Sequence, residues 1–178
     1  MSETTQSMAP DPGHSDDEAW RGEIGKLGSA DLDLFLGGSL ICRLGCLTPD
    51  GAPYVVPCWF EWTGREFYIV PRRKSAWARY IQRDGRVCLS IDEDAPPYRK
   101  VMVEGMGAIA EEPNVGGQWV EIARRMSLRY LGEHGPDYLE PTLNQPRWLI
   151  RVTPHKMTTW QGVAWHPRYF ETGAHSTP

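Results

Sequence analysis

Residues 51–75 read GAPYVVPCWFEWTGREFYIVPRRKS, and this stretch decides the fold. Tyr54–Trp62 is rich in β-branched and aromatic residues, which favour a strand, and Thr63–Arg65 supplies a turn. Glu66–Val70 is expected to return beside it, and the short apolar run Leu40–Leu47 precedes it. The three segments with their short links predict an antiparallel meander. Because no strand–helix–strand alternation follows, a parallel dinucleotide-binding sheet is not expected.

The rest of the chain extends this pattern with further strands and three helices. Ser29 or Asp31 can cap a first helix, and Ser75 can cap a second. We expect a mainly β (α+β) chain with six or seven strands in a small antiparallel barrel and helices at its periphery. The helices are expected at Ser29–Leu36, Ser75–Gln82 and Val115–Leu131, and the remaining strands at Val87–Ile91, Val101–Ala110, Arg147–Thr153 and Met157–Trp160.

Charge and composition divide the chain into one domain and two tails. Of the formal net charge of −4, residues 1–18 hold five acids and no base, so the remainder is close to neutral. A nearly neutral domain gives no electrostatic reason to expect binding to nucleic acid or to a membrane. We expect a disordered acidic tail at 1–18, a cofactor-binding domain at 19–170 and a flexible tail at 171–178. The start does not resemble a signal peptide and no apolar run has bilayer length, which predicts a cytoplasmic protein.

The cysteines and histidines do not predict a metal site. Cys42, Cys46, Cys58 and Cys88 show no CxxC spacing and lie in apolar runs, so buried reduced thiols are expected. The five histidines are scattered, without an HExxH motif or a Cys/His cluster. No metal ligand is therefore predicted.

A basic cluster stands at the end of the decisive stretch. Residues 72–86 hold six cations against the single acid Asp84, and Arg72–Lys74 lie where a strand is expected to end and a helix to begin. Free N–H groups at a helix start, the basic side chains and the Ser75 hydroxyl would together hold a phosphate. For the later arginines of the run, a solvated helix face explains the charge as well.

Two further signals are weaker. Arg99 and Lys100 precede a strand, where basic residues also serve to protect a sheet edge. The chain has eight tryptophans, whose rings cover flat aromatic ligands but also fill cores and dimer interfaces. Four of them lie in strands or just beyond, at Trp59, Trp148, Trp160 and Trp165.

Five segments follow one another at a recognisable spacing. They are GAPYVVPCWF (51–60), FYIVPRRK (67–74), SAWARYIQRDGRV (75–87), RKVMVEG (99–105) and PHKMTTWQG (154–162), the last followed by HPR (166–168). In this order they resemble the pyridoxamine 5′-phosphate oxidase-like family of FMN-binding split β-barrels. The resemblance covers about Leu40–Arg168 and rests on order and spacing more than on a single motif.

The resemblance implies a six-stranded split β-barrel that forms a homodimer, with FMN or the deazaflavin F420 at each subunit interface. In that family the ring lies against two strands and the phosphate at the following helix start, while the second subunit and the C-terminal segment complete the site. The ring positions here are Val55, Val56, Pro57, Trp59, Val70 and Pro71, and the phosphate positions are Arg72, Arg73, Lys74 and Ser75. The partner would contribute Lys100, Trp160 and Arg168 to the cofactor and His166 to the substrate, and Trp77 is included in the cofactor site where much of the family has lysine.

The C-terminal segment also departs from the oxidase pattern. The gap from Trp160 to His166 is shorter than in the oxidases, and Ala164-Trp165 replaces an Arg-Leu pair. We therefore expect a relative of the oxidase and not the oxidase itself.

Two functions follow from the resemblance. The first is an FMN- or F420-dependent oxidoreductase that passes hydride between cofactor and a small conjugated substrate, for which no catalytic side chain is obligatory. A basic face from Arg72 through Arg79 and Arg83 would suit the long anionic tail of F420. The second is a protein that binds or stores flavin or haem without turnover.

Overall fold

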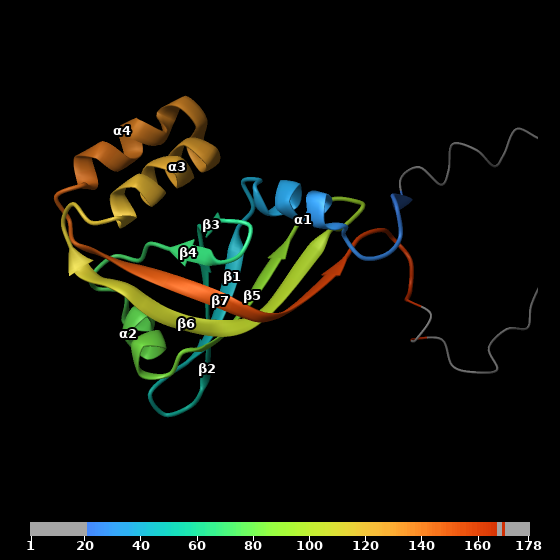
Figure 1. The fold of residues 1–178 in the computed structure, drawn as a ribbon, viewed down its shortest axis with the longest axis horizontal. Coiled ribbons are helices and arrows are strands. Elements are labelled where there is room, and N and C mark those ends of the chain that lie inside the picture. The colour runs from blue at the N-terminus through green and yellow to red at the C-terminus, as the bar shows by residue number, and fades with distance from the viewer. Residues whose placement is uncertain (1–20, 167–168, 170–178) are drawn as a thin grey trace, which may run out of the picture.

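One antiparallel sheet runs the length of the molecule (Figure 1) in the computed structural model, which describes residues 21–166 and 169. Its strand order is β2-β1-β5-β6-β7-β4-β3. The α+β class with a mainly antiparallel sheet is confirmed, with seven strands where the family resemblance implied six. The strands are β1 (Cys42–Leu47), β2 (Pro53–Cys58), β3 (Glu61–Trp62), β4 (Phe67–Ile69), β5 (Arg86–Asp92), β6 (Lys100–Asn114) and β7 (Arg147–Trp160).

The sheet curls but its ladder of hydrogen bonds does not close. Its two edge strands, β2 and β3, are separated along the chain by Trp59 and Phe60 alone. The prediction of one strand over Tyr54–Trp62 was wrong at these two residues, because the chain passes there from one edge of the sheet to the other. The fully buried Phe60 fills the core at this crossing. The split between the two edges is where the barrel opens.

Strand β7 is continuous, although two strands separated at Pro154 were expected. A proline removes a ladder hydrogen bond and is tolerated in a strand at a bulge. The register of β6 against β7 shifts between Glu104 and Gly105, directly opposite Pro154. A side chain at Gly105 would place its Cβ 2.7 Å from the Thr153 carbonyl oxygen, so glycine permits the close approach.

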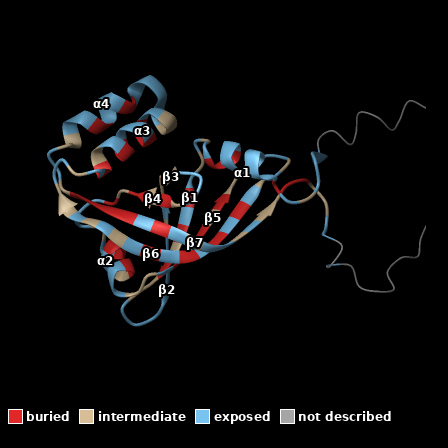
Figure 2. Cartoon of the chain, viewed as in Figure 1, coloured by how far each residue is buried: buried red, intermediate tan, exposed pale blue. Residues whose placement is uncertain are grey.

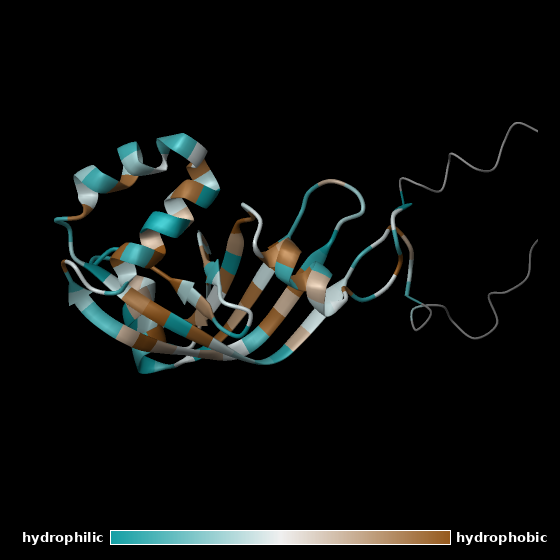
Figure 3. Cartoon of the chain, turned by 45° about the horizontal axis from the view of Figure 1, so that its top comes forward, coloured by the Kyte–Doolittle hydropathy of each residue, from teal (hydrophilic) through white to brown (hydrophobic). Residues whose placement is uncertain are grey.

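Helices cover both faces of this sheet (Figure 2) and build two cores. Helices α1 (Ser29–Leu36) and α2 (Ala76–Arg83) bury their apolar faces in the main core inside the curl. Helices α3 (Trp119–Leu131) and α4 (Gly135–Leu139) form a smaller core against the opposite face of β4 and β7. Successive side chains of a strand face opposite sides of the sheet. Hydrophobic (brown) and hydrophilic (teal) residues accordingly alternate along parts of the strands in Figure 3. On β7, Ile150 and Val152 point to the main core and Leu149 to the smaller one.

The helices differ from the sequence expectations in number and at their ends: α4 was not expected, and α2 runs one residue later than Ser75–Gln82. Helix α3 begins at Trp119 and not at Val115, because Gly116 has φ +88° and the Glu111 carboxylate accepts the backbone N–H of Gln118 at 2.9 Å. Helix α1 is capped by Gly28 and not by Ser29 or Asp31. Ser75 is the N-cap residue of α2, but its hydroxyl makes no capping hydrogen bond.

The cysteines are all free thiols, but burial was predicted correctly for two of the four. Cys42 and Cys46 are buried, whereas Cys58 is half-buried and Cys88 is exposed. Strand alternation turns Cys88 to the outer face of β5. In the described part of the chain, no helix is long and apolar enough to cross a membrane.

Candidate functional site

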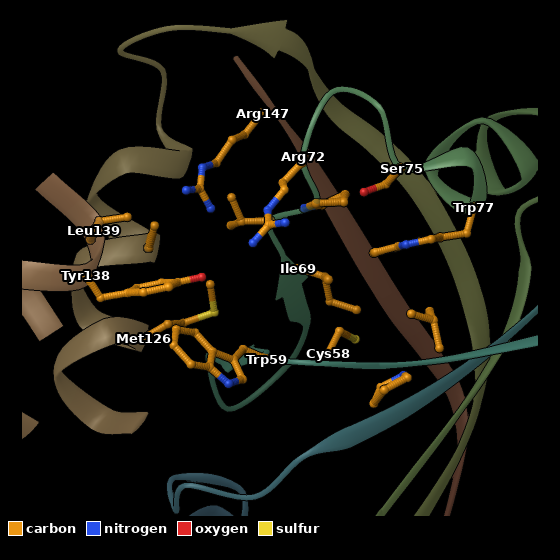
Figure 4. A pocket seen from close by; sticks show the side chains of 15 residues that line it. Cys58, Trp59, Ile69, Arg72, Ser75, Trp77, Met126, Tyr138, Leu139 and Arg147 are labelled. Atoms are coloured by element: carbon orange, nitrogen blue, oxygen red, sulfur yellow. The ribbon is translucent and has the colours of Figure 1, made fainter. Parts of the chain in front are cut away.

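A cavity of about 320 Å³ lies between the sheet and helices α3 and α4 (Figure 4). This volume is at the small end of the range of ligand pockets, about 300–1,000 Å³. One wall is formed by β2, β4 and the start of α2, and the other by the two helices. The lining residues from the sheet side are Val56, Pro57, Cys58, Trp59, Ile69, Val70, Pro71, Arg72, Ser75, Trp77 and Arg147, and those from the helices are Ala123, Met126, Tyr138 and Leu139.

The aromatic wall of the cavity is held in place by contacts with helix α3. The Trp59 ring stacks on the Tyr130 ring with centroids 4.7 Å apart, and it contacts the Tyr138 ring at 5.5 Å. The Tyr130 hydroxyl donates a hydrogen bond to the Leu40 carbonyl oxygen at 2.6 Å and accepts one from the Phe60 N–H at 3.4 Å. Burial raises the pKa of Tyr130 to about 12. The hydroxyl therefore stays protonated and fixes the stacked pair.

The opposite end of the cavity carries two arginines side by side. Arg72 and Arg147 are partners in an isolated antiparallel bridge, which places their side chains on the same face. Flanking hydrogen bonds fix this bridge: the Trp148 N–H donates to the Pro71 carbonyl at 3.0 Å, and the Arg73 N–H to the Pro146 carbonyl at 3.1 Å. Both guanidinium groups point into the space that Figure 4 shows.

Arg147 is 9% exposed and incompletely paired. Its Nη2 donates to Thr142 Oγ1 at 2.6 Å and its guanidinium lies 5.4 Å from the Trp119 ring centroid, but its Nε has no hydrogen-bond partner. Burial lowers the pKa of Arg147, and the neighbouring Arg72 cation lowers it further. Among the described residues, no carboxylate forms a salt bridge with either arginine.

A basic groove of about 440 Å³ continues from this end of the cavity. Arg72, Tyr138 and Arg147 line both hollows, so they stand at the junction of the cavity and the groove. The other groove residues are Arg73, Lys74, Thr142, Gln145 and Pro146.

A third hollow, of about 690 Å³, lies at the far end of the long strands. It contains Lys100, Trp160 and His166, and Lys100 pairs with Trp160 across β6 and β7. Arg147 begins β7 and Trp160 ends it, so at about 3.3 Å per residue the two sites are separated by roughly 40 Å. A single chain does not bring these residues to the cavity.

The residues expected to bind the cofactor, together with the expected substrate residue His166, thus fall into three groups. Val56, Pro57, Trp59, Val70, Pro71, Arg72, Ser75 and Trp77 line the cavity, Arg73 and Lys74 line the groove, and Lys100, Trp160 and His166 line the distant hollow. Val55 is 65% exposed and turned away from the cavity lining, because neighbouring residues of a strand face opposite sides. Arg168 lies outside the described residues.

The expected basic face from Arg72 to Arg83 is not continuous. The Arg83 side chain bonds to the Pro49 carbonyl oxygen and lines a different hollow, together with Asp84 and Arg86. The cations next to Arg72 in space are instead Arg147 and those of the groove.

The family model for pyridoxamine 5′-phosphate oxidase matches residues 30–161, which include every strand of the sheet and the cavity. The chain belongs to the pyridoxamine 5′-phosphate oxidase family. No curated protein matches the sequence significantly.

Several solved structures share the fold of this chain. A conserved hypothetical protein of Mycobacterium tuberculosis is 23% identical, with a TM-score of 0.60, and the match covers 79% of this chain and 88% of that one. An F420 reductase is 25% identical, with a TM-score of 0.55 and coverage of 71% and 94%. The haem storage protein HutZ of Vibrio cholerae is 15% identical, with a TM-score of 0.58 and coverage of 74% and 93%.

Sequence reasoning within this family missed several cavity residues. Arg147, Met126, Tyr138 and Cys58 line the cavity but were not among the expected site residues. No motif next to Arg147 in the sequence indicates a site. The residues that lie beside it in the cavity come from distant segments, around β4 and in α4. Cys58 lies inside the quoted stretch, where its place on β2 beside Trp59 was the available signal.

Two carboxylates close in sequence to expected site residues, Glu61 and Glu104, are engaged elsewhere. Glu61 accepts hydrogen bonds from Arg125 at 2.8 Å and Arg129 at 3.0 Å, and these contacts anchor α3 to β3. Glu104 pairs with Lys156 on the outer face of the sheet. Neither residue lines the cavity.

Proposed function

We propose that the protein is an oxidoreductase that binds FMN or F420 in the cavity and passes hydride between the cofactor and a small conjugated substrate. The observation that carries this proposal is the combination of a cavity walled by apolar and aromatic side chains with two guanidinium groups at one end, neither of which forms a salt bridge with a carboxylate of the described chain. A flavin-type cofactor has the matching parts, a flat ring and an anionic group. The family membership and the likeness to an F420 reductase support the same choice.

The residues present fit such a group. The ring would lie among Val56–Trp59 and Val70, with the fixed Trp59 ring as one wall. Its anionic group would then meet Arg72 and the Ser75 hydroxyl, which does not cap its own helix. Because β2 is an edge strand, backbone groups on its free side are available to hydrogen-bond the edge of a ring.

A bound flavin or deazaflavin supplies the hydride-transfer chemistry itself. The role of this chain is to orient the ring, exclude water with its aromatic wall and neutralise the anionic group. No Asp, Glu or His lines the cavity as described, and this kind of transfer does not require one.

We further propose that the active unit is a homodimer. Lys100, Trp160 and His166 are distant from the cavity of their own chain, so they would complete the site of a second copy. Exposed apolar side chains on the outer face of the sheet, Val55, Met102 and Met106, are suited to such an interface. Light scattering of the purified protein tests this, and a monomer at micromolar concentration would contradict it.

A second candidate function is binding or storage of haem without turnover. Cys58, Met126 and Tyr138 line the cavity, and their side chains are of types that ligate haem iron. Arg72 and Arg147 would then face the propionates. The fold shared with a haem storage protein is compatible with this function.

The visible absorption spectrum of the purified protein, before and after incubation with FMN, F420 or haem, separates these candidates. We expect flavin or deazaflavin bands, and re-oxidation of the reduced cofactor when an enone or quinone is added under anaerobic conditions. A Soret band without flavin binding would favour the haem protein. Flavin binding without re-oxidation by any acceptor would reject the enzymatic role.

A further inference from the structure

We propose that Arg147 and Arg72 form a single anion clamp at the junction of the cavity and the groove, which holds one phosphate or carboxylate group between two guanidiniums. Neither the family resemblance nor the comparisons assign a role to Arg147. The clamp itself rests on the geometry of the cavity, and only its assignment to the cofactor phosphate rests on the proposed function.

The backbone forces the two cations together. Bridge partners in an antiparallel pair have Cβ atoms about 4.5–5.5 Å apart, and like charges placed directly opposite are destabilising. The bridge between Arg72 and Arg147 is tied on both sides by the hydrogen bonds of Arg73 and Trp148, so the residues cannot separate by local fraying. An anion between them would relieve this repulsion.

The hydrogen-bonding capacity of the pair is largely unused. A guanidinium has five N–H donors, and a buried cation requires compensation. For Arg147, the hydrogen bond to Thr142 uses one donor, while Nε is buried without a partner. The ring of Trp119 supports one face of the group but accepts none of these hydrogens in its plane. A planar or tetrahedral oxyanion matches the fork of such a side chain.

The position of the clamp indicates what kind of ligand it serves. On one side lies the apolar cavity, and on the other the groove with Arg73, Lys74 and Gln145. Tyr138 lines both hollows, and Figure 4 shows its ring on the helix side of the cavity. A ligand with a flat apolar part and a polar extension would therefore place its first anionic group at Arg72 and Arg147.

The test compares Arg147→Gln and Arg72→Gln with Arg151→Gln, a matched loss of one positive charge from the same strand as Arg147. Arg151 is exposed, lies near Glu66 and lines none of the three hollows. Two readouts are used for each protein. The first is the stabilisation by inorganic phosphate in thermal unfolding, against chloride at equal ionic strength. The second is the ratio of the dissociation constants of riboflavin and FMN, which share a ring and differ by one phosphate.

We expect phosphate to stabilise the wild type and Arg151→Gln, with apparent affinity lowered roughly 10- to 100-fold in both clamp variants, since charged hydrogen bonds are lost. If FMN binding falls by a similar factor while riboflavin binding is unchanged, the clamp holds the cofactor phosphate. If FMN binding is unchanged, the clamp holds an anionic group of another ligand, such as a substrate carboxylate. Absence of both FMN and F420 binding, with phosphate binding intact, would reject the proposed function and keep the clamp.

The clamp is overturned if phosphate stabilises none of the proteins, or if all three variants respond to phosphate as the wild type does. Arg147 is buried, so Arg147→Lys, which keeps the charge without the planar fork of donors, is measured beside Arg147→Gln. Arg72 is exposed, and Arg72→Gln is expected to fold in any case. If Arg72→Gln bound phosphate as tightly as the wild type does, that result alone would contradict the proposal.

Discussion

At the scale of single residues, the Tyr130 hydroxyl links helix α3 to the wall of the cavity. The hydroxyl donates a hydrogen bond to the Leu40 carbonyl oxygen at 2.6 Å, and the Tyr130 ring stacks on the Trp59 ring. Tyr130→Phe keeps the stacking but leaves that carbonyl without its donor. We expect a loss of about 1–3 kcal/mol in the free energy of unfolding, measured by urea denaturation. An unchanged free energy would mean that water replaces the hydroxyl without cost.

The same residue predicts a dependence of stability on alkaline pH. Burial raises the pKa of Tyr130 to about 12, above the value near 10 of an exposed tyrosine. The folded state therefore binds more protons than the unfolded state between pH 10 and 12, and this contribution to stability is complete below pH 10 and lost as pH rises through 12. In Tyr130→Phe this part of the decline should be absent. Parallel pH profiles of the two proteins would contradict the prediction.

The residues of the site were predictable from sequence only where chemistry and local position coincide. Trp59 and Arg72 lie in or beside strands of the opening stretch, and both line the cavity. Arg147 joins them through a backbone bridge to a residue 75 positions earlier, a long-range pairing that no local pattern encodes. The same limit applies to Tyr138, whose position depends on how α4 packs.

At the scale of elements, the spacing of α3 and α4 sets the width of the cavity. Gly135 is buried where the two helices approach, and an added Cβ would lie 2.6 Å from the Ser127 backbone. Gly135→Ala should therefore push α4 away and displace Tyr138 and Leu139, which line the cavity. We expect a destabilisation of about 1–3 kcal/mol together with weaker cofactor binding.

Glu133→Ala serves as the control for this prediction, because Glu133 is exposed in the same connection between the helices. Thermal unfolding and a flavin titration of both variants provide the comparison. If Gly135→Ala binds flavin like Glu133→Ala, the spacing of the helices does not control the cavity.

Elements with strong local signals were predicted closely, and those shaped by distant contacts were not. Helix α1 has the expected bounds because Gly37 follows its apolar face directly. Strand β7 continues through Pro154 because a bulge lies beside it. Glu104 and Gly105 are consecutive on β6 but pair with Lys156 and Pro154, so His155 is the extra residue, and this irregularity depends on a strand that is distant in the sequence. The break at Trp59 and Phe60 likewise depends on the whole sheet, because the chain passes there from one edge strand to the other.

At the scale of the whole molecule, the antiparallel sheet and its family followed from the sequence, while the division of the site did not. Strand periodicity and turn residues indicated the sheet. The residues implied by the family resemblance, however, lie in hollows at opposite ends of β7. That separation is a property of the folded chain, and it makes the second copy part of the functional hypothesis.

The central proposal is that the cavity holds a flavin-type cofactor, and filling that cavity with a larger side chain tests it directly. Ala123 is buried on α3 and lines the cavity, whereas Leu128 on the same helix is 53% exposed. The decisive measurement is a fluorescence titration of FMN and of F420 with wild type, Ala123→Phe and Leu128→Phe, each checked for folding by circular dichroism. We expect wild type and Leu128→Phe to bind one of the two cofactors alike. Ala123→Phe should bind it at least about tenfold more weakly, since a ring in the cavity competes with the ligand. Equal binding by all three proteins, or no binding of either cofactor by the wild type, would contradict it.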